Sequence, residues 1–203
     1  MFDIREKGND YKIVPCLYFE KPGPQNTKQT LEVAARRAEE LGLKDIIVAS
    51  NSGETGFLAA EIFKGKNVVV ITHSTGFTGP DIQELSPENR EKLLKAGVKV
   101  LTCQHALGGV GRAVRKKLGT YQLEEIMAFT LRIFGQGVKV AVEIALMAAD
   151  AGLVSTGTSS VAIGGTGRGA DTALVLKPAH VQNFFNLRIQ EILAKPRLSQ
   201  KEV

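Results

Sequence analysis

Four short segments rich in glycine, serine, threonine and histidine carry the residue types that could bind a small anionic ligand. Three of them follow an apolar run, and the fourth joins two apolar runs. Backbone N–H groups in such loops, above all at the start of a helix, are suited to holding a phosphate. The first to fourth loops are residues 50–56, 72–79, 103–112 and 164–169. We therefore predict ligand-binding residues in all four loops, namely Ser50, Asn51, Ser52, Gly53, Glu54, Thr55, Thr72, His73, Thr75, Gly76, His105, Gly108, Gly109, Gly165, Thr166, Gly167 and Arg168.

Common nucleotide motifs do not account for these loops. The sequence GxxxxGK[ST] is absent, which argues against a P-loop nucleotidase. Gly165-Thr166-Gly167 precedes a strand pattern rather than a helix. Gly109-Val110-Gly111 is followed by Val114 where the dinucleotide fingerprint has its third glycine. We therefore do not expect a Rossmann dehydrogenase.

The reactive side chains do not form a recognisable catalytic set. Cys103, His105 and His73 fall at neighbouring strand ends, but their spacing repeats no metal-ligand pattern. A cysteine just after a buried strand is usually a small core residue. Glu54 and Asp171 are the nearest carboxylates, and no spacing pairs them as acid and base. We predict no metal site, assign no catalytic residue, and expect the histidines to hydrogen-bond a ligand or to lie at the surface.

Alternating apolar runs and amphipathic segments must position these loops. Val/Ile-rich runs predict buried strands, and helical periodicity with capping residues predicts helices between them. The predicted strands are 45–49, 67–72, 98–102, 160–163 and 172–176, with an edge strand or extended arm at 13–19. The predicted helices are 27–40, 54–65, 86–97, 121–134, 137–152 and 181–193. This order predicts a three-layer α/β/α sandwich with ligands at the carboxyl ends of the parallel strands.

Length and composition are typical of one soluble globular domain. The 203 residues are 43% hydrophobic and 23% charged, so we expect a single domain over 1–203, with an arm over about 1–20 and a tail after about 195. The longest apolar stretch, 138–149, is interrupted by Lys139 and Glu143, which argues against a membrane span. The first ten residues lack the apolar segment of a secretory signal. We therefore expect a cytoplasmic protein with reduced cysteines.

The net charge of +5 raises the question of a nucleic-acid partner. The basic residues are densest at Arg112, Arg115, Lys116 and Lys117. Proteins that bind single strands usually interleave aromatic residues with their bases, and this chain has no tryptophan and three tyrosines. A solvated basic face is the preferred interpretation, and nucleic-acid binding stays an alternative to be tested by its salt dependence.

The segment 137–152 is apolar on two sides, whereas a helix that covers a sheet needs one apolar side. The second side is covered either by the neighbouring segment 121–134 or by another subunit. Obligate interfaces resemble a core cut in half, and we expect a homo-oligomer, a dimer at least.

Three stretches together resemble the C-terminal domain of pyruvate kinases. LKDIIVASNSGETGFLA (43–59) is similar to the strand, phosphate-gripping turn and helix of that domain. VEIALMAADAGL (142–153) is similar to its late helix, and SVAIGGTGRGADTALVL (160–176) resembles its closing hairpin. The order of elements agrees over about 27–177. The resemblance implies a mixed, mostly parallel sheet of about five strands whose final strand is antiparallel.

In pyruvate kinases this domain is regulatory, and in many of them it binds a sugar bisphosphate. Carried over, the phosphate turn corresponds to Ser50, Ser52, Gly53 and Thr55, and the closing loop corresponds to 165–168. Glu54 stands where that turn often has a basic residue, which argues against a sugar bisphosphate. The chain shows no catalytic barrel, so we do not expect a pyruvate kinase.

The chain looks most like stand-alone pyruvate-kinase C-terminal-domain-like proteins of prokaryotes, with which we associate flavin mononucleotide (FMN). The resemblance therefore implies a protein that binds a phosphorylated small molecule, first of all FMN. A regulatory or sensing module for a sugar phosphate or nucleotide is the alternative, and the sequence leaves open whether any reaction is catalysed.

Overall fold

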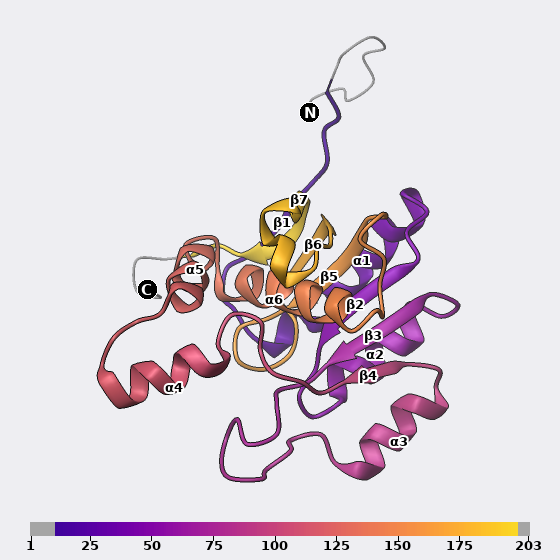
Figure 1. Cartoon of the computed structure of the whole chain (residues 1–203). Helices are drawn as coiled ribbons and strands as arrows, with labels where there is room; N and C mark the ends of the chain where they lie inside the picture. Colours follow the sequence, from indigo (N-terminus) through magenta and orange to yellow (C-terminus); the bar gives the residue numbers. More distant parts are fainter. Residues whose placement is uncertain (1–10, 199–203) are drawn as a thin grey trace.

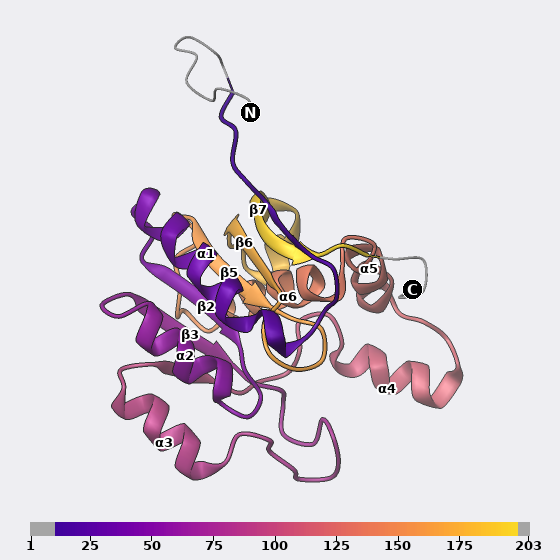
Figure 2. The ribbon, with the colours of Figure 1, turned by 180° about the vertical axis from the view of Figure 1, so that it is seen from behind.

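In the computed structural model, which describes residues 11–198, a seven-stranded sheet lies between layers of helices (Figures 1 and 2). The strands are β1 (Leu17–Phe19), β2 (Asp45–Ala49), β3 (Asn67–Ile71), β4 (Lys99–Leu101), β5 (Ser160–Gly164), β6 (Thr172–Lys177) and β7 (Arg188–Pro196). The helices are α1 (Thr27–Glu40), α2 (Glu54–Ile62), α3 (Pro87–Lys95), α4 (Gly109–Leu118), α5 (Leu123–Arg132) and α6 (Gln136–Asp150), with short 3-10 helices η1 (Pro24–Asn26) and η2 (Val181–Asn186).

The strands are ordered β1-β7-β6-β5-β2-β3-β4, and β6 alone runs against its neighbours. The mixed sheet and the antiparallel β6 confirm the predicted three-layer α/β/α fold. Since β2, β3, β4 and β5 are parallel, the loops that follow them all leave from one edge of the sheet. This edge positions the candidate site.

Alternating side chains of the central strands point into two separate hydrophobic cores, one on each face of the sheet. On one face, Ile46 and Val48 pack with Leu31 of α1 and Leu93 of α3. On the other face, Ile47 packs among the residues of α6. Both faces are covered, which explains why the central strands are continuous apolar runs rather than alternating ones.

Local signals set several helix boundaries. The Ser86 side chain accepts a hydrogen bond from the Asn89 N–H and caps α3, as its sequence predicts. Gly56 lets α2 approach the sheet, because a Cβ there would lie 2.9 Å from Val70 Cγ2. These contacts fix the start of α2 over the ends of β2 and β3.

Two parts of the prediction are wrong. The helix expected over 181–193 is instead η2 followed by β7, so the sheet has seven strands rather than about five. The apolar residues of this segment recur at near-helical spacing, which is why a helix was expected. They do not alternate strictly as in a regular strand, because the pairing of β7 with β6 contains register shifts. The second error concerns α4, a helix that was not predicted and that begins within the third loop. It was not predicted because Gly109 and Gly111 disfavour a helix locally.

Helix α6 is buried within one chain, between the sheet, α5 and η2. It therefore leaves no free side for another subunit. Helix α5 does expose large apolar residues, namely Leu123, Ile126 and Phe129. The segment 13–19, expected as an edge strand or extended arm, contains β1 at one edge of the sheet. The part of the arm before residue 11 lies outside the described residues. In residues 11–198, no helix has both the length and the apolar character needed to cross a bilayer.

Candidate functional site

A cavity of about 600 Å³ opens at the carboxyl edge of the parallel strands, and all four predicted loops contribute to its lining. Helix α6 forms much of its inner wall through Val140, Ile144 and Met147. A cavity of this size, with mixed polar and apolar walls, is typical of small-molecule sites. The predicted residues that line it are Ser50, Asn51, Ser52, Glu54, Thr55, Thr72, His73, His105, Gly165, Gly167 and Arg168.

The first loop is a tight turn at the start of α2. Gly53 adopts φ +99°, a left-handed conformation that favours glycine, and the Ser50 hydroxyl accepts a hydrogen bond from the Gly56 N–H. Asn89 Nδ2 donates to the Ser52 carbonyl and holds the turn from outside. Within the described chain, the N–H groups from Ser52 to Thr55 have no hydrogen-bond acceptor. The turn therefore presents a run of free donors beside the cavity.

The fourth loop is pinned to the N-terminal segment. Asp171 is fully buried and accepts from the N–H groups of Thr166 and Gly23, so it has a structural role and does not line the cavity. A Cβ on Gly169 would lie 2.5 Å from Pro24 Cα, so a side chain there would collide with the backbone. These contacts place the exposed Arg168 at the cavity rim, and no described carboxylate pairs with its guanidinium.

His73 in the second loop has its tautomer fixed by its neighbours. Asn51 Oδ1 accepts from the His73 backbone N–H, so Asn51 Nδ2 must be the group that faces His73 Nε2, at 3.1 Å. His73 Nε2 is then the acceptor, and its Nδ1–H donates to Glu84 Oε2 at 2.6 Å. The carboxylate therefore orients the ring, with the unprotonated Nε2 directed at the Asn51 amide.

His105 in the third loop is oriented in a similar way. Its Nε2 accepts from the Ser74 N–H at 3.4 Å, and its Nδ1 faces Glu143 Oε2 at 3.6 Å. Glu143 also pairs with Lys139 and accepts from the Leu107 N–H at 3.0 Å. This buried carboxylate therefore joins the third loop to α6.

Charge and burial compete within the Lys139–Glu143 pair. Burial alone would raise the pKa of Glu143, but the contact with His105 and the charge of Lys139 outweigh it and lower the pKa to about 2. Burial lowers the pKa of Lys139 despite this carboxylate, and the charges of Arg132 and Arg112 add to the lowering. Two further cations therefore lie close to the pair.

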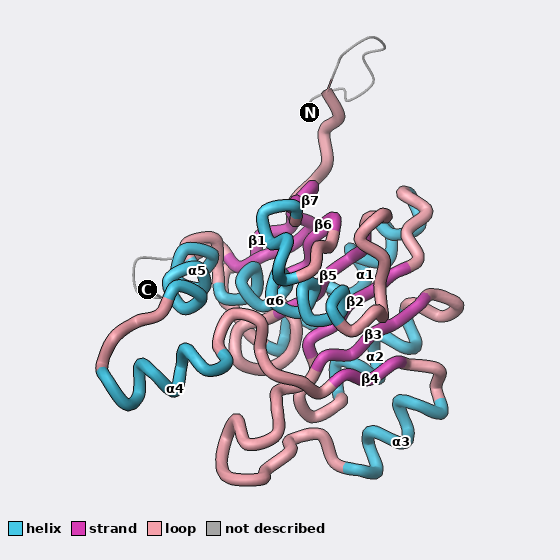
Figure 3. The backbone as a smooth tube through the Cα atoms, viewed as in Figure 1, coloured by secondary structure: helices cyan, strands magenta, loops and turns pink. Residues whose placement is uncertain are grey.

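Phe77 of the second loop closes over both histidines. Its ring centroid lies 4.0 Å from that of His73 and 5.0 Å from that of His105, and both pairs are stacked. Phe77 belongs to the irregular stretch 72–86, which leads from β3 to α3 (Figure 3). The three rings form a stacked aromatic cluster at this part of the cavity.

The remaining predicted residues, Gly53, Thr75, Gly76, Gly108, Gly109 and Thr166, do not line the cavity, and several of them shape its loops. Sequence reasoning missed other lining residues, chiefly Phe77, Glu84, Arg112, Arg132, Lys139 and Glu143. Lys139 and Glu143 had a visible signal, because they are charges four residues apart in an otherwise apolar helix. Among residues 11–198, no three His, Cys, Asp or Glu side chains gather as metal ligands.

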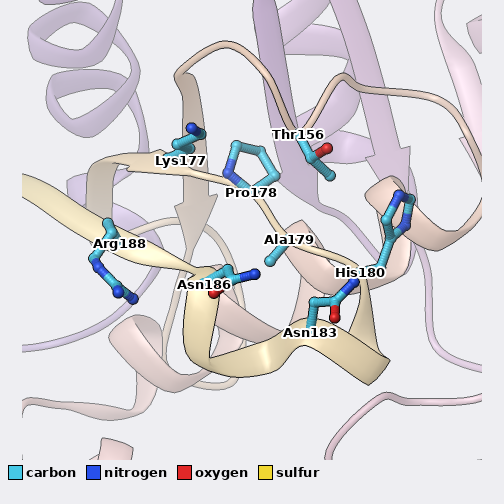
Figure 4. A pocket seen from close by; sticks show the side chains of 8 residues that line it. All are labelled: Thr156, Lys177, Pro178, Ala179, His180, Asn183, Asn186 and Arg188. Atoms are coloured by element: carbon cyan, nitrogen blue, oxygen red, sulfur yellow. The ribbon is translucent and has the colours of Figure 1, made fainter.

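A second hollow, of about 380 Å³, lies at the opposite edge of the sheet, between the segments before β5 and after β6. Its cations do not converge, because Lys177 and Arg188 point apart (Figure 4). Arg188 Nη1 instead donates to the carbonyl groups of Phe185 and Leu187. The convergence of donors, aromatic rings and charges favours the cavity at the carboxyl edge as the candidate site.

Comparison with known protein families agrees with this architecture. The family model described as "Pyruvate kinase, alpha/beta domain" matches residues 28–176. The match runs from α1 to β6 and so includes the first, second, third and fourth loops of the cavity.

Proposed function

The chain belongs to the pyruvate kinase alpha/beta domain family, and from this premise we propose that it binds a phosphorylated small molecule at the carboxyl edge, with FMN as the ligand. The observation that carries the proposal is the run of free N–H donors from Ser52 to Thr55 at the start of α2, in the same cavity as a cluster of aromatic rings. The two features match the two ends of FMN, a phosphate and a planar ring system.

The phosphate is assigned to the turn at the start of α2. The helix dipole and the free donors favour an anion there, and Arg168 on the opposing loop supplies a charge. Glu54 lines the same region and disfavours a second phosphate, which supports a monophosphate over a sugar bisphosphate.

The ring system is assigned to the space beside His73, Phe77 and His105. Stacked aromatic side chains favour a planar heteroaromatic ligand, and Val140, Ile144 and Met147 supply apolar contact from α6. FMN supplies redox chemistry when bound. Of the residues around it, His73 carries its proton on Nδ1, where Glu84 accepts it, and directs the lone pair of Nε2 at the Asn51 amide.

The proposal also assigns the protein to the cytoplasm. Cys16 and Cys103 are both unpaired in the structure, and a reducing compartment keeps such thiols free.

Absorbance of the purified protein and a flavin titration test the proposal. We expect either co-purified yellow flavin or saturable quenching of FMN fluorescence, with riboflavin bound at least tenfold more weakly because it lacks the phosphate. Arg168→Gln should weaken FMN binding about 10- to 150-fold, since a hydrogen bond to a charged group contributes about 1.5–3 kcal/mol.

The matched control is Lys177→Gln, which removes a cation at the opposite edge and should leave FMN affinity unchanged. A colourless protein that neither quenches FMN nor gains thermal stability from it would refute the flavin assignment. Equal affinity for FMN and riboflavin would refute the assignment of the phosphate turn.

A further inference from the structure

We infer that the same cavity contains a second anion subsite, formed by Lys139, Arg112 and Arg132, which takes the carboxylate or phosphate group of a second small ligand. This inference rests on the proposed function, because it assigns FMN to the other part of the cavity and a separate anionic molecule to this part.

The three cations come from three different helices and line one cavity. Lys139 lies in the first turn of α6 with its side chain 6% exposed, and Arg112 of α4 and Arg132 of α5 are half-buried. The contribution of both guanidinium charges to the lowered pKa of Lys139 reflects their proximity. Like charges repel one another, so such a group needs anions nearby.

The protein supplies too little negative charge at this point. Glu143 is the one carboxylate that pairs with Lys139 in the described chain, and it also faces His105 and the Leu107 N–H. Of the other carboxylates that line the cavity, Glu84 pairs with His73 and Glu54 lies in the first turn of α2. The three cations and Glu143 therefore keep an excess positive charge of about two. Glu143 neutralises the charge of Lys139, and the two arginines carry the unbalanced positive charge.

Both arginines keep donors free for a ligand. Arg112 lies over the Phe77 ring at 5.1 Å, and Arg132 lies over the Phe129 ring at 4.9 Å with its Nε bonded to Gln136. Neither guanidinium has a carboxylate partner among residues 11–198. A guanidinium held by aromatic stacking presents its planar N–H fork, which matches a carboxylate or a phosphate.

The subsite is separate from the phosphate turn. The turn begins α2, which packs on the face of the sheet shared with α1 and α3, whereas Lys139 lies on α6 over the other face. Figures 1 and 2 show α2 and α6 on opposite sides of the sheet. Two anionic groups can therefore enter the cavity together, one from each side of the sheet edge.

The test uses the FMN-loaded protein, in which the phosphate turn is occupied, with inorganic phosphate and oxalate as separate probes. We expect one or both probes to raise the melting temperature and to perturb the flavin absorbance, whereas chloride at equal ionic strength does neither. A response to oxalate alone identifies a carboxylate site, and a response to phosphate alone identifies a phosphate site.

The variant Arg112→Gln/Arg132→Gln should weaken the probe at least tenfold, and its FMN affinity is measured in parallel so that probe binding is compared at equal FMN occupancy. The control Lys116→Gln/Lys117→Gln removes two charges from the exposed side of α4 and should leave probe binding intact. A probe response unchanged by the first variant, or no probe response in the loaded wild type, overturns the inference.

Failure of the proposed function gives a different pattern. If the protein takes no FMN, the probes are titrated into the free protein together with Arg168→Gln. Probe binding lost only in Arg112→Gln/Arg132→Gln would support the subsite although FMN is not the ligand. Probe binding lost only in Arg168→Gln would overturn it.

Discussion

Replacing Glu143 by glutamine should expose how much the fold depends on one buried carboxylate. The substitution keeps the shape of the side chain but removes the charge that faces Lys139 and His105. Breaking a buried ion pair from one side typically costs about 3–5 kcal/mol, because the remaining charge is left buried without a partner. We therefore expect Glu143→Gln to lower the free energy of unfolding by about 3–5 kcal/mol at neutral pH.

The pKa of Glu143 gives an independent magnitude. A fall from the ordinary value of 4.5 to about 2 corresponds to about 3 kcal/mol, since one pKa unit is about 1.4 kcal/mol. The folded state holds this proton less tightly than the unfolded state. The stabilisation is therefore complete above about pH 4.5 and is lost as the pH falls towards 2.

Urea denaturation of wild type and Glu143→Gln at pH 7, 4 and 3 measures both effects. The difference in unfolding free energy should be largest at pH 7 and should shrink as the pH falls. Glu88→Gln is the matched control, because Glu88 and Lys92 are also four residues apart but lie exposed on α3, where such pairs contribute little. A loss below 1 kcal/mol at pH 7, or a difference that does not change with pH, would refute the reasoning.

Two further predictions concern packing and assembly. Gly164→Ala should destabilise the fold by about 1–3 kcal/mol in urea denaturation, because its Cβ would lie 2.6 Å from the Gly137 carbonyl oxygen of α6. The control Gly157→Ala, in a roomier loop, should change the free energy of unfolding by less than about 0.5 kcal/mol. Equal effects of the two substitutions would contradict this account. Light scattering should report at least twice 21.9 kDa at micromolar concentration, and Ile126→Glu on the exposed face of α5 should reduce that mass; a monomer at every dilution would contradict the assembly prediction.

The central part of the fold could be predicted because its signals are local. Val/Ile runs such as 45–49 are buried on both faces, and capping residues such as Ser86 mark helix starts. The topology of a parallel sheet then brings the loops to one edge, which is why residues as distant as Ser50 and Arg168 line the same cavity.

The rest depends on contacts that the local sequence does not encode. Segment 188–196 is a strand because β6 and β1 lie beside it, and its own periodicity favours a helix. Arg132 and Glu84 come to the cavity from elements with no motif of their own. Their roles follow from distances between side chains, such as that from Glu84 to His73, which only the folded chain provides.

The pairing of β1 with β7 has a consequence for the order in which the protein is made. Among residues 11–198, Leu17–Phe19 pair with Ala194–Pro196 alone, about 175 residues further along, so β1 emerges from the ribosome long before the strand that it pairs with. The same late segment brings Glu191 to the buried Arg37 of α1, whose guanidinium has no other carboxylate in the described chain except Glu40. The β1 ladder and the Arg37–Glu191 ion pair therefore cannot form until residues 188–196 have been synthesised. A nascent chain released before Arg188 would leave this edge of the sheet open to other chains.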